Sequence, residues 1–248
     1  MKISFFEEFP STRSLGKLKY VTWACTVYVA ARSVKEFRKH VKEHKKKGIT
    51  FAWWPILSKE EGYWLSPFSS PKAVKRVIND AIASKVSVMW DAELPFRHPW
   101  LFLRCDNFIR NKRIIKRFFR KYGKKIITAE YPVKNKIVHW WFKRMGVSFS
   151  PQKYGNRKIV MYYTSMHKLI PSFLLPGISG MHSLYGTKLH VGLGTIATGI
   201  LGDEPILSVQ ELKRDLDEMQ ERGINDVVIF RLGGMNRRYK NVLQKFAK

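Results

Sequence analysis

Short apolar, β-prone segments alternate with amphipathic helical segments along the whole chain. The expected strands span residues 2–6, 26–31, 49–56, 86–90, 125–129, 158–164, 189–195 and 226–232. Ser33 to Glu36 and Ser208 to Glu211 have the spacing of capping boxes, which mark helix starts between strands. Eight strand–helix units in one alternation favour a parallel sheet that closes on itself. We therefore predict an α/β fold, a single-domain (β/α)8 TIM barrel over residues 1–248.

Two alternatives remain open at this point. A doubly wound open sheet would show the same alternation, but no Gly-x-Gly-x-x-Gly motif follows the first strand, which disfavours the form that binds a dinucleotide. The sixth strand is also ambiguous, because residues 147–150 and 158–164 are both strand-like with no helix between them. We assign the longer segment to the sheet.

The charge is the outlying feature of the composition. The chain has 46 Lys and Arg against 19 Asp and Glu, a formal net charge of +27. Such a surface attracts polyanions through its long-range field and by releasing their counterions. A nucleic acid or an anionic membrane surface is therefore a possible partner, and a basic barrel without chemistry, acting as a scaffold there, is the third and weakest reading.

Compartment signals are few. The longest apolar run, from Tyr20 to Ala31, is too short and too polar to span a bilayer. Glu7 and Glu8 stand where a signal peptide needs its apolar segment. We expect a cytoplasmic protein; the oligomeric state cannot be read from the sequence.

The most informative strand end is Val86 to Pro95. Residues 86–90 are apolar and β-prone, as in a strand that is buried on both faces. Asp91 and Glu93 follow at a spacing of two, which directs both side chains to the same face about 7 Å apart. Two carboxyl groups at the end of a buried strand are costly unless they have a function. We predict an acid/base pair; the structural alternative is that they cap the next helix or pair with Arg97.

Other polar and aromatic residues also stand at the predicted strand ends. In a (β/α)8 barrel the carboxyl ends of the strands form the active site. The expected substrate-binding residues there are Glu8, Trp54, Glu130, Thr195 and Arg231. Together they predict an acid-lined mouth with an aromatic rim inside a basic exterior. Aromatic walls with paired carboxyls suit a sugar, so the expected partner is a small molecule or an oligosaccharide.

A competing site lies at the ends of the last two strands. Glycines at these turns could expose backbone N–H groups to a phosphate, as in many barrels. The candidate phosphate-binding residues are Gly192, Gly194, Gly233 and Gly234, with Arg231 nearby. The alternative function is therefore a barrel that binds a phosphorylated or polyanionic ligand, such as a sugar phosphate, a lipid headgroup or nucleic acid.

A helical segment from Pro67 to Ile78 leads into the strand that ends Asp91-Ala-Glu93-Leu-Pro95. This arrangement resembles the chitinase-type family of glycoside hydrolases, whose fourth strand ends in Asp-x-Glu and whose sixth carries Met-x-Tyr, as in Met161-Tyr-Tyr163 here. The resemblance covers residues 26–165 loosely. It implies that Glu93 is the general acid, that Asp91 orients the acetamido group of the substrate, whose oxygen is the nucleophile, and that Tyr163 hydrogen-bonds to that group.

The chain also departs from the family pattern. Met89 stands where the family has a further acid, and the glycine-rich segment before the motif is absent. Phe230 and Arg231 occupy the place of the tryptophan of strand 8, and Thr164 stands where an acid often follows the tyrosine. A non-hydrolytic relative fits these departures as well as an enzyme does.

No cofactor or metal is expected. His40 and His44 lie four residues apart on a predicted helix, a spacing that a metal could use, but they stand among many lysines. The remaining histidines have no ligand-like spacing, and no Walker glycine loop is present.

Overall fold

The computed structural model describes residues 1–94, 100, 102, 105–133, 135–169, 178–200 and 202–248. Eight parallel strands form a closed barrel in sequence order, with β1 paired to β8. The strands are β1 Lys2–Glu7, β2 Cys25–Ala31, β3 Ile49–Pro55, β4 Val88–Asp91, β5 Ile126–Glu130, β6 Arg157–Met161, β7 Leu189–Gly194 and β8 Asp226–Phe230. The predicted TIM barrel is confirmed, and the open sheet is excluded.

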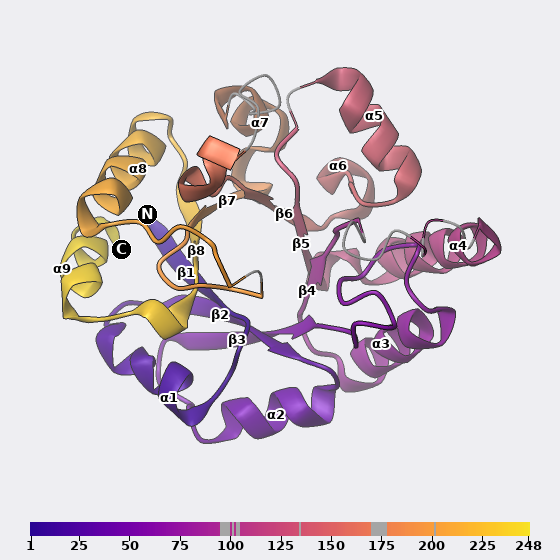
Figure 1. Ribbon diagram of the computed structural model, residues 1–248, viewed down its shortest axis with the longest axis horizontal. Coiled ribbons are helices and arrows are strands. Elements are labelled where there is room, and N and C mark those ends of the chain that lie inside the picture. Colours follow the sequence, from indigo (N-terminus) through magenta and orange to yellow (C-terminus); the bar gives the residue numbers. More distant parts are fainter. Residues whose placement is uncertain (95–99, 101, 103–104, 134, 170–177, 201) are drawn as a thin grey trace.

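Helices surround the barrel as an outer ring (Figure 1). They are α1 Thr12–Leu15, α2 Val34–Lys42, α3 Pro71–Ser84, α4 Cys105–Tyr122, α5 Lys136–Met145, α6 Pro151–Tyr154, α7 Ile178–Tyr185, α8 Val209–Glu221 and α9 Arg237–Phe246. Short 3-10 segments are η1 Gly16–Tyr20, η3 Gly123–Lys125, η4 Thr164–Leu169, η6 Gly186–Lys188 and η7 Leu232–Gly234. None of the described helices is long and apolar enough to cross a membrane.

Two local predictions need correction or refinement. The sixth strand is residues 157–161, so the longer of the two candidate segments forms it and 147–150 does not. The expected capping box at Ser33 is incomplete: the Ser33 hydroxyl accepts the N–H of Glu36, but the Glu36 carboxylate accepts the N–H of Arg32. The capping box at Ser208 and Glu211 is present with both of its hydrogen bonds.

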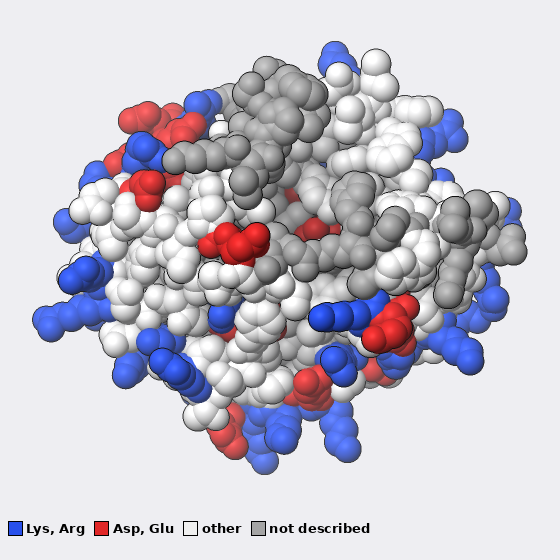
Figure 2. Space-filling model, viewed as in Figure 1, with Lys and Arg blue, Asp and Glu red and all other residues white. Residues whose placement is uncertain are grey.

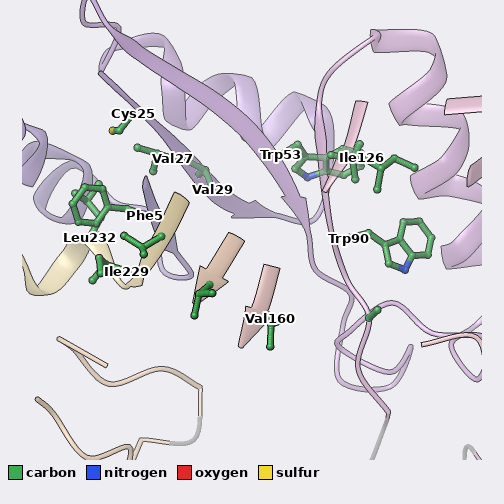
Figure 3. Close-up of a cluster of buried hydrophobic side chains, with 14 of the residues drawn as sticks. Phe5, Cys25, Val27, Val29, Trp53, Trp90, Ile126, Val160, Ile229 and Leu232 are labelled. Carbon is green, nitrogen blue, oxygen red and sulfur yellow. The ribbon is translucent and has the colours of Figure 1, made fainter. Parts of the chain in front are cut away.

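Successive side chains along each strand alternate between two apolar layers, one inside the barrel and one between the barrel and the helices. One set of side chains fills the barrel and includes Phe6, Met89 and Ala129. The neighbouring residues point outward and pack against the helices (Figure 3). Trp90, for example, meets the rings of Phe118 and Phe119 on α4. Since side chains in a strand alternate between faces, this parity also decides which residues beyond each strand end can reach the barrel mouth.

Candidate active site

A cavity of about 200 Å³ lies at the carboxyl ends of the strands. Figure 2 shows carboxylates near the middle of this face of the molecule and many Lys and Arg side chains around its edge. The residues that line the cavity are Phe6, Glu8, Trp54, Trp64, Met89, Asp91, Glu93, Ala129, Tyr131, Pro132, Met161, Tyr163, Met166, Thr195, Ile200, Glu204 and Phe230. Its lining is thus acidic and aromatic, and includes no Lys, Arg or His among the described residues.

Asp91 and Glu93 reach this cavity because they share the parity of Met89, which points into the barrel. The two carboxyl groups are hydrogen-bonded to each other. The hydroxyl of Tyr131 donates to Oε2 of Glu93 at 2.9 Å. Tyr163, from the segment after β6, lines the same cavity. The structure therefore brings together the three residues to which the sequence assigned catalytic roles.

Burial raises the pKa of both members of this pair. The pKa of Glu93 rises to about 6, because desolvation outweighs the hydrogen bonds from Tyr131 and Asp91. The pKa of Asp91 is raised well above its ordinary value by burial and then by the negative charges of Glu93 and Glu8. Hence both carboxyl groups hold a proton more readily than exposed carboxyl groups do.

A third carboxyl group, that of Glu8, faces the cavity from the end of β1. Its Oε1 accepts the hydroxyl of Tyr63 at 2.8 Å, and its Oε2 accepts the N–H of Ile200 at 3.1 Å. Burial raises the pKa of Glu8 to about 7 in spite of these hydrogen bonds. Glu204, beside it, accepts the N–H groups of Gly199 and Gly202. Glu8 and Glu204 thereby hold the backbone after β7, at Gly199, Ile200 and Gly202, next to the cavity.

Two buried polar atoms of the cavity residues have no close hydrogen-bond partner within the described part of the chain, although Trp54 and Asp91 interact with each other. They are Nε1 of Trp54 and Oδ1 of Asp91. Trp54 and Asp91 are only 4% and 2% exposed, so water does not readily hydrogen-bond to these two atoms. A ligand with both a hydrogen-bond acceptor and a donor, such as a sugar hydroxyl or an acetamido group, would satisfy them.

Tyr163 and Thr195 differ in what they offer to a ligand. Burial and the charges of Asp91 and Glu93 raise the pKa of Tyr163 well above its usual value, so its hydroxyl stays protonated. Its ring packs against Phe230 with the centroids 5.7 Å apart. Thr195 lines the cavity, but its hydroxyl donates to the carbonyl of Pro205 and its N–H donates to Ser165. Tyr163 can therefore bind a ligand through its hydroxyl, whereas the polar groups of Thr195 are already used.

Glu130 does not lie in the cavity, contrary to the sequence-based prediction. It has the opposite parity to Ala129 and points to the outer side of the barrel. There its Oε2 lies 2.8 Å from Nζ of Lys158, and its Oε1 accepts the N–H of Phe149 and the hydroxyl of Thr128. These contacts give Glu130 a structural role.

Arg231 is also absent from the cavity lining. Its Nη1 lies 3.0 Å from Oε1 of Glu7, and its Nε donates to the carbonyl of Thr198. The N–H of Gly233 donates to Oε2 of the same carboxylate at 2.6 Å. The groups proposed to hold a phosphate thus hold the carboxylate of Glu7, and the alternative phosphate site loses its main donors.

Close packing explains the other glycines of that alternative site. A Cβ at Gly192 would lie 3.2 Å from the Tyr163 ring, and one at Gly234 would lie 2.0 Å from the carbonyl oxygen of Ile196. Gly194 has a φ of +147° and abuts Phe230. These positions require glycine for backbone contact with neighbouring segments and for backbone conformation.

Tyr131 and Tyr63 are functional candidates that the sequence analysis missed. Tyr131 directly follows Glu130, and the alternation that turns Glu130 outward turns Tyr131 toward Glu93. The strand parity, taken from the inward Ala129, could have identified it. Tyr63 belongs to the long segment between β3 and α3, where no periodicity indicates which side chain reaches Glu8.

The departures from the family pattern also have a place in the structure. Met89 is fully buried below Asp91 and gives the cavity an apolar floor, and Phe230 lines its wall. The hydroxyl of Thr164 donates to Asp215 on α8 and not toward the cavity. Arg97, the suggested structural partner of the acidic pair, lies outside the described residues. Within the described part of the chain, no group of His, Cys, Asp and Glu has the arrangement of a metal site.

Comparison with known proteins gives a likeness in structure alone. No protein family and no curated protein matches the sequence. Among solved structures, a family 18 chitinase from Cycas revoluta in complex with (GlcNAc)3 has a TM-score of 0.58 at 12% identity, covering 99% of each chain. The PgaB (BpsB) glycoside hydrolase domain from Bordetella bronchiseptica has a TM-score of 0.58 at 10% identity, covering 100% of this chain and 98% of that one.

A family 18 N-acetylglucosaminidase from Paenibacillus barengoltzii has a TM-score of 0.55 at 9% identity, covering 99% of each chain. At these identities the similarity establishes the fold: a barrel like that of the chitinase-type glycoside hydrolases, remote in sequence and extending over the whole chain.

Proposed function

We propose that the protein is a glycoside hydrolase that cleaves an oligosaccharide containing a 2-acetamido sugar, with Glu93 as general acid and then general base. The observation that carries the proposal is the grouping of Asp91, Glu93 and Tyr163 around one cavity at the barrel mouth. The likeness to barrels that include a chitinase in complex with (GlcNAc)3 supports this substrate class.

The proposed reaction begins with a proton on Glu93. Glu93 would protonate the glycosidic oxygen while the acetamido oxygen of the substrate attacks the anomeric carbon, so the leaving group departs as an alcohol. Asp91 would hydrogen-bond to the acetamido N–H and stabilise the positive charge that develops on this group. The Tyr163 hydroxyl would donate to the acetamido oxygen and hold it below the ring. Glu93, now a carboxylate, would then take a proton from the water that opens the cyclic intermediate.

The rest of the cavity suits this chemistry. Trp54 and Trp64 provide aromatic walls for the CH groups of a sugar ring. Tyr131 donates to Glu93 and so fixes the rotamer of the acid. Glu8 also lines the cavity, and its carboxyl could accept hydroxyl groups of a neighbouring sugar unit.

The test is hydrolysis of oligosaccharides of N-acetylglucosamine, followed by proton NMR of the product. The wild-type protein should release product with retention of the anomeric configuration, because two displacements occur at the same carbon. Glu93→Gln should lower turnover by about 10² to 10⁴-fold. The exposed Glu221→Gln variant is the matched control and should be unaffected. An inverted product, or full activity in Glu93→Gln, would contradict the mechanism.

A further inference from the structure

Helix α5 exposes three large apolar side chains on one part of its surface. None of its residues is buried. Ile137 is 75% exposed, Trp140 56% and Trp141 41%. Large apolar side chains in this density on one helix mark a surface that meets another apolar phase.

These side chains lie on one face together with cations. Ile137, Trp140, Trp141 and Arg144 are spaced by three and four residues, which places them on the same side of a helix. The guanidinium of Arg144 lies over the Trp140 ring, 5.0 Å from its centroid. We call this surface the basic aromatic face; it consists of Lys136, Ile137, Trp140, Trp141, Lys143 and Arg144, all exposed.

The surroundings of this face are basic as well. Residues 131–202 contain no Asp or Glu at all, and Glu130 just before them is held by Lys158. α4, which lies next to α5 on the outer ring in Figure 1, exposes Arg113, Arg117 and Arg120. The exposed positive charge there has no carboxylate to neutralise it from α5, α6 or α7.

The cations of α4 and α5 also meet at the junction of the two helices. The aliphatic stem of Lys112 would lie 3.8 Å from a Cβ added at Gly146, the residue that ends α5. Burial lowers the pKa of Lys112, and the positive charges of Lys116 and Arg144 lower it further. Cations that repel one another in this way are stabilised by an anionic partner.

We propose that the basic aromatic face binds the surface of a bilayer that contains anionic phospholipid. Trp140, Trp141 and Ile137 enter the boundary between headgroups and acyl chains, where tryptophan is most favourable. Lys136, Lys143 and Arg144 remain at the level of the lipid phosphates. A bilayer is favoured over nucleic acid because Ile137 has no π-face to stack on a base, whereas an acyl layer removes all three side chains from water.

Binding to phosphatidylcholine vesicles, with and without phosphatidylserine, tests the proposal by cosedimentation of the full chain. The protein should bind the vesicles that contain phosphatidylserine, and Trp140→Ala/Trp141→Ala should weaken this binding by about tenfold or more through lost apolar contact. Lys136→Glu/Lys143→Glu should weaken it by at least about tenfold, since each surface cation contributes about 1 kcal/mol, a factor of about five.

Two matched controls separate this face from the general charge. Lys39→Glu/Lys42→Glu removes the same charge from α2, where both lysines are exposed, and should weaken binding clearly less. Ile82→Ala/Ile206→Ala removes exposed apolar side chains elsewhere and should have no effect. Quenching of tryptophan fluorescence by brominated lipid should occur in the wild type and be reduced in the double tryptophan variant.

Three outcomes would overturn the proposal: no binding to the anionic vesicles, equal loss of binding in the α2 and α5 charge variants, or unchanged binding in Trp140→Ala/Trp141→Ala. Binding to a labelled single-stranded oligonucleotide that depends on the two tryptophans, while vesicle binding does not, would assign the face to nucleic acid. The substituted residues of Trp140→Ala/Trp141→Ala and Lys136→Glu/Lys143→Glu lie outside the cavity, so both variants should keep the activity of the wild type toward a soluble substrate.

Discussion

The buried carboxyl groups at the strand ends fall into two regions with different partners. Outside the barrel wall, Glu7 is held by Arg231 and Glu130 by Lys158, each through an ion pair and backbone N–H groups. In the cavity, Glu8, Asp91 and Glu93 have tyrosines, backbone N–H groups or one another as partners, and no cation lies among the described lining residues. The chain has a net charge of +27, so cationic side chains are abundant. Their absence from the described lining of the cavity is therefore the informative difference between the two regions.

This difference separates the carboxyl groups that stabilise the fold from those that can act in catalysis. A buried cation offsets part of the cost of burying a carboxylate and joins two segments of the fold, although burial still raises the pKa of Glu7 in spite of Arg231. A buried carboxyl without a cation has a raised pKa, and so it can carry a proton near neutral pH. The outer pairs should therefore control stability, and the cavity carboxyls should control activity and its dependence on pH. The predictions below test this division.

After Glu93→Gln, Asp91→Asn should have the largest effect on activity. The amide keeps the size of the side chain but cannot supply a carboxylate to stabilise charge on the acetamido group, so kcat should fall by about 10² to 10³-fold. The melting temperature should stay the same or rise, because a buried carboxyl is removed. A variant with full kcat would show that the pair is not catalytic.

Lys158→Met should have the largest effect on stability. Removing the cation leaves Glu130 buried and uncompensated, which should cost about 3 to 5 kcal/mol of unfolding free energy in urea denaturation. The double variant Glu130→Gln/Lys158→Met should recover part of this loss. The kcat per folded molecule should equal that of the wild type in both variants. A lower kcat per folded molecule would show that Glu130 has a role beyond the ion pair.

Glu8→Gln should flatten the dependence of stability on pH. The pKa of Glu8 is about 7 in the folded protein and near 4.5 when unfolded, so the folded state binds the proton more tightly. The resulting stabilisation is fully present below pH 4.5 and is lost as the pH rises through 7. The wild type should therefore lose about 2 to 3 kcal/mol more than the variant between about pH 5 and 8. Parallel curves for the two proteins, measured by urea denaturation, would show that Glu8 carries its charge in the folded state at both pH values.

The pH profile of kcat/KM should fall on the alkaline side above about pH 6. Glu93 must carry a proton to act as the acid, and its pKa is raised to about 6. Activity should decline about tenfold per pH unit beyond that point. In Tyr131→Phe the carboxylate loses a hydrogen bond that favours its charged form, so the decline should begin at higher pH. A profile that is flat from pH 5 to 8 would exclude Glu93 as the acid.

Tyr163→Phe should have the smallest effect. The loss of one hydrogen bond to the acetamido oxygen should lower kcat/KM by about tenfold, or about 1.4 kcal/mol. The ring contact with Phe230 is kept, so the stability should change little. Thr195→Val is the matched variant at the end of the neighbouring strand. The Thr195 hydroxyl donates to the carbonyl of Pro205, so this variant should leave kcat/KM unchanged while lowering stability.

Much of the candidate site could be predicted because it depends on local spacing. Asp91 and Glu93 stand two residues apart at the end of a buried strand, and the two-residue period brings both to one face. The same period, applied from Phe6 and Ala129, separates Glu8 from Glu7 and Tyr131 from Glu130. The errors at Glu130 and Arg231 arose where position at a strand end was used without this parity.

The sequence by itself determined the closed barrel, the position of the acidic pair and the basic exterior, because periodicity and charge are properties of neighbouring residues. Only the tertiary structure decided which carboxyls are matched by cations. The partner of Glu7 directly follows β8 and that of Glu130 lies in β6, and Tyr63 reaches Glu8 from a long segment without periodicity. Such contacts join parts of the chain far apart in sequence, and their geometry is fixed by closure of the barrel, not by any local preference of the residues.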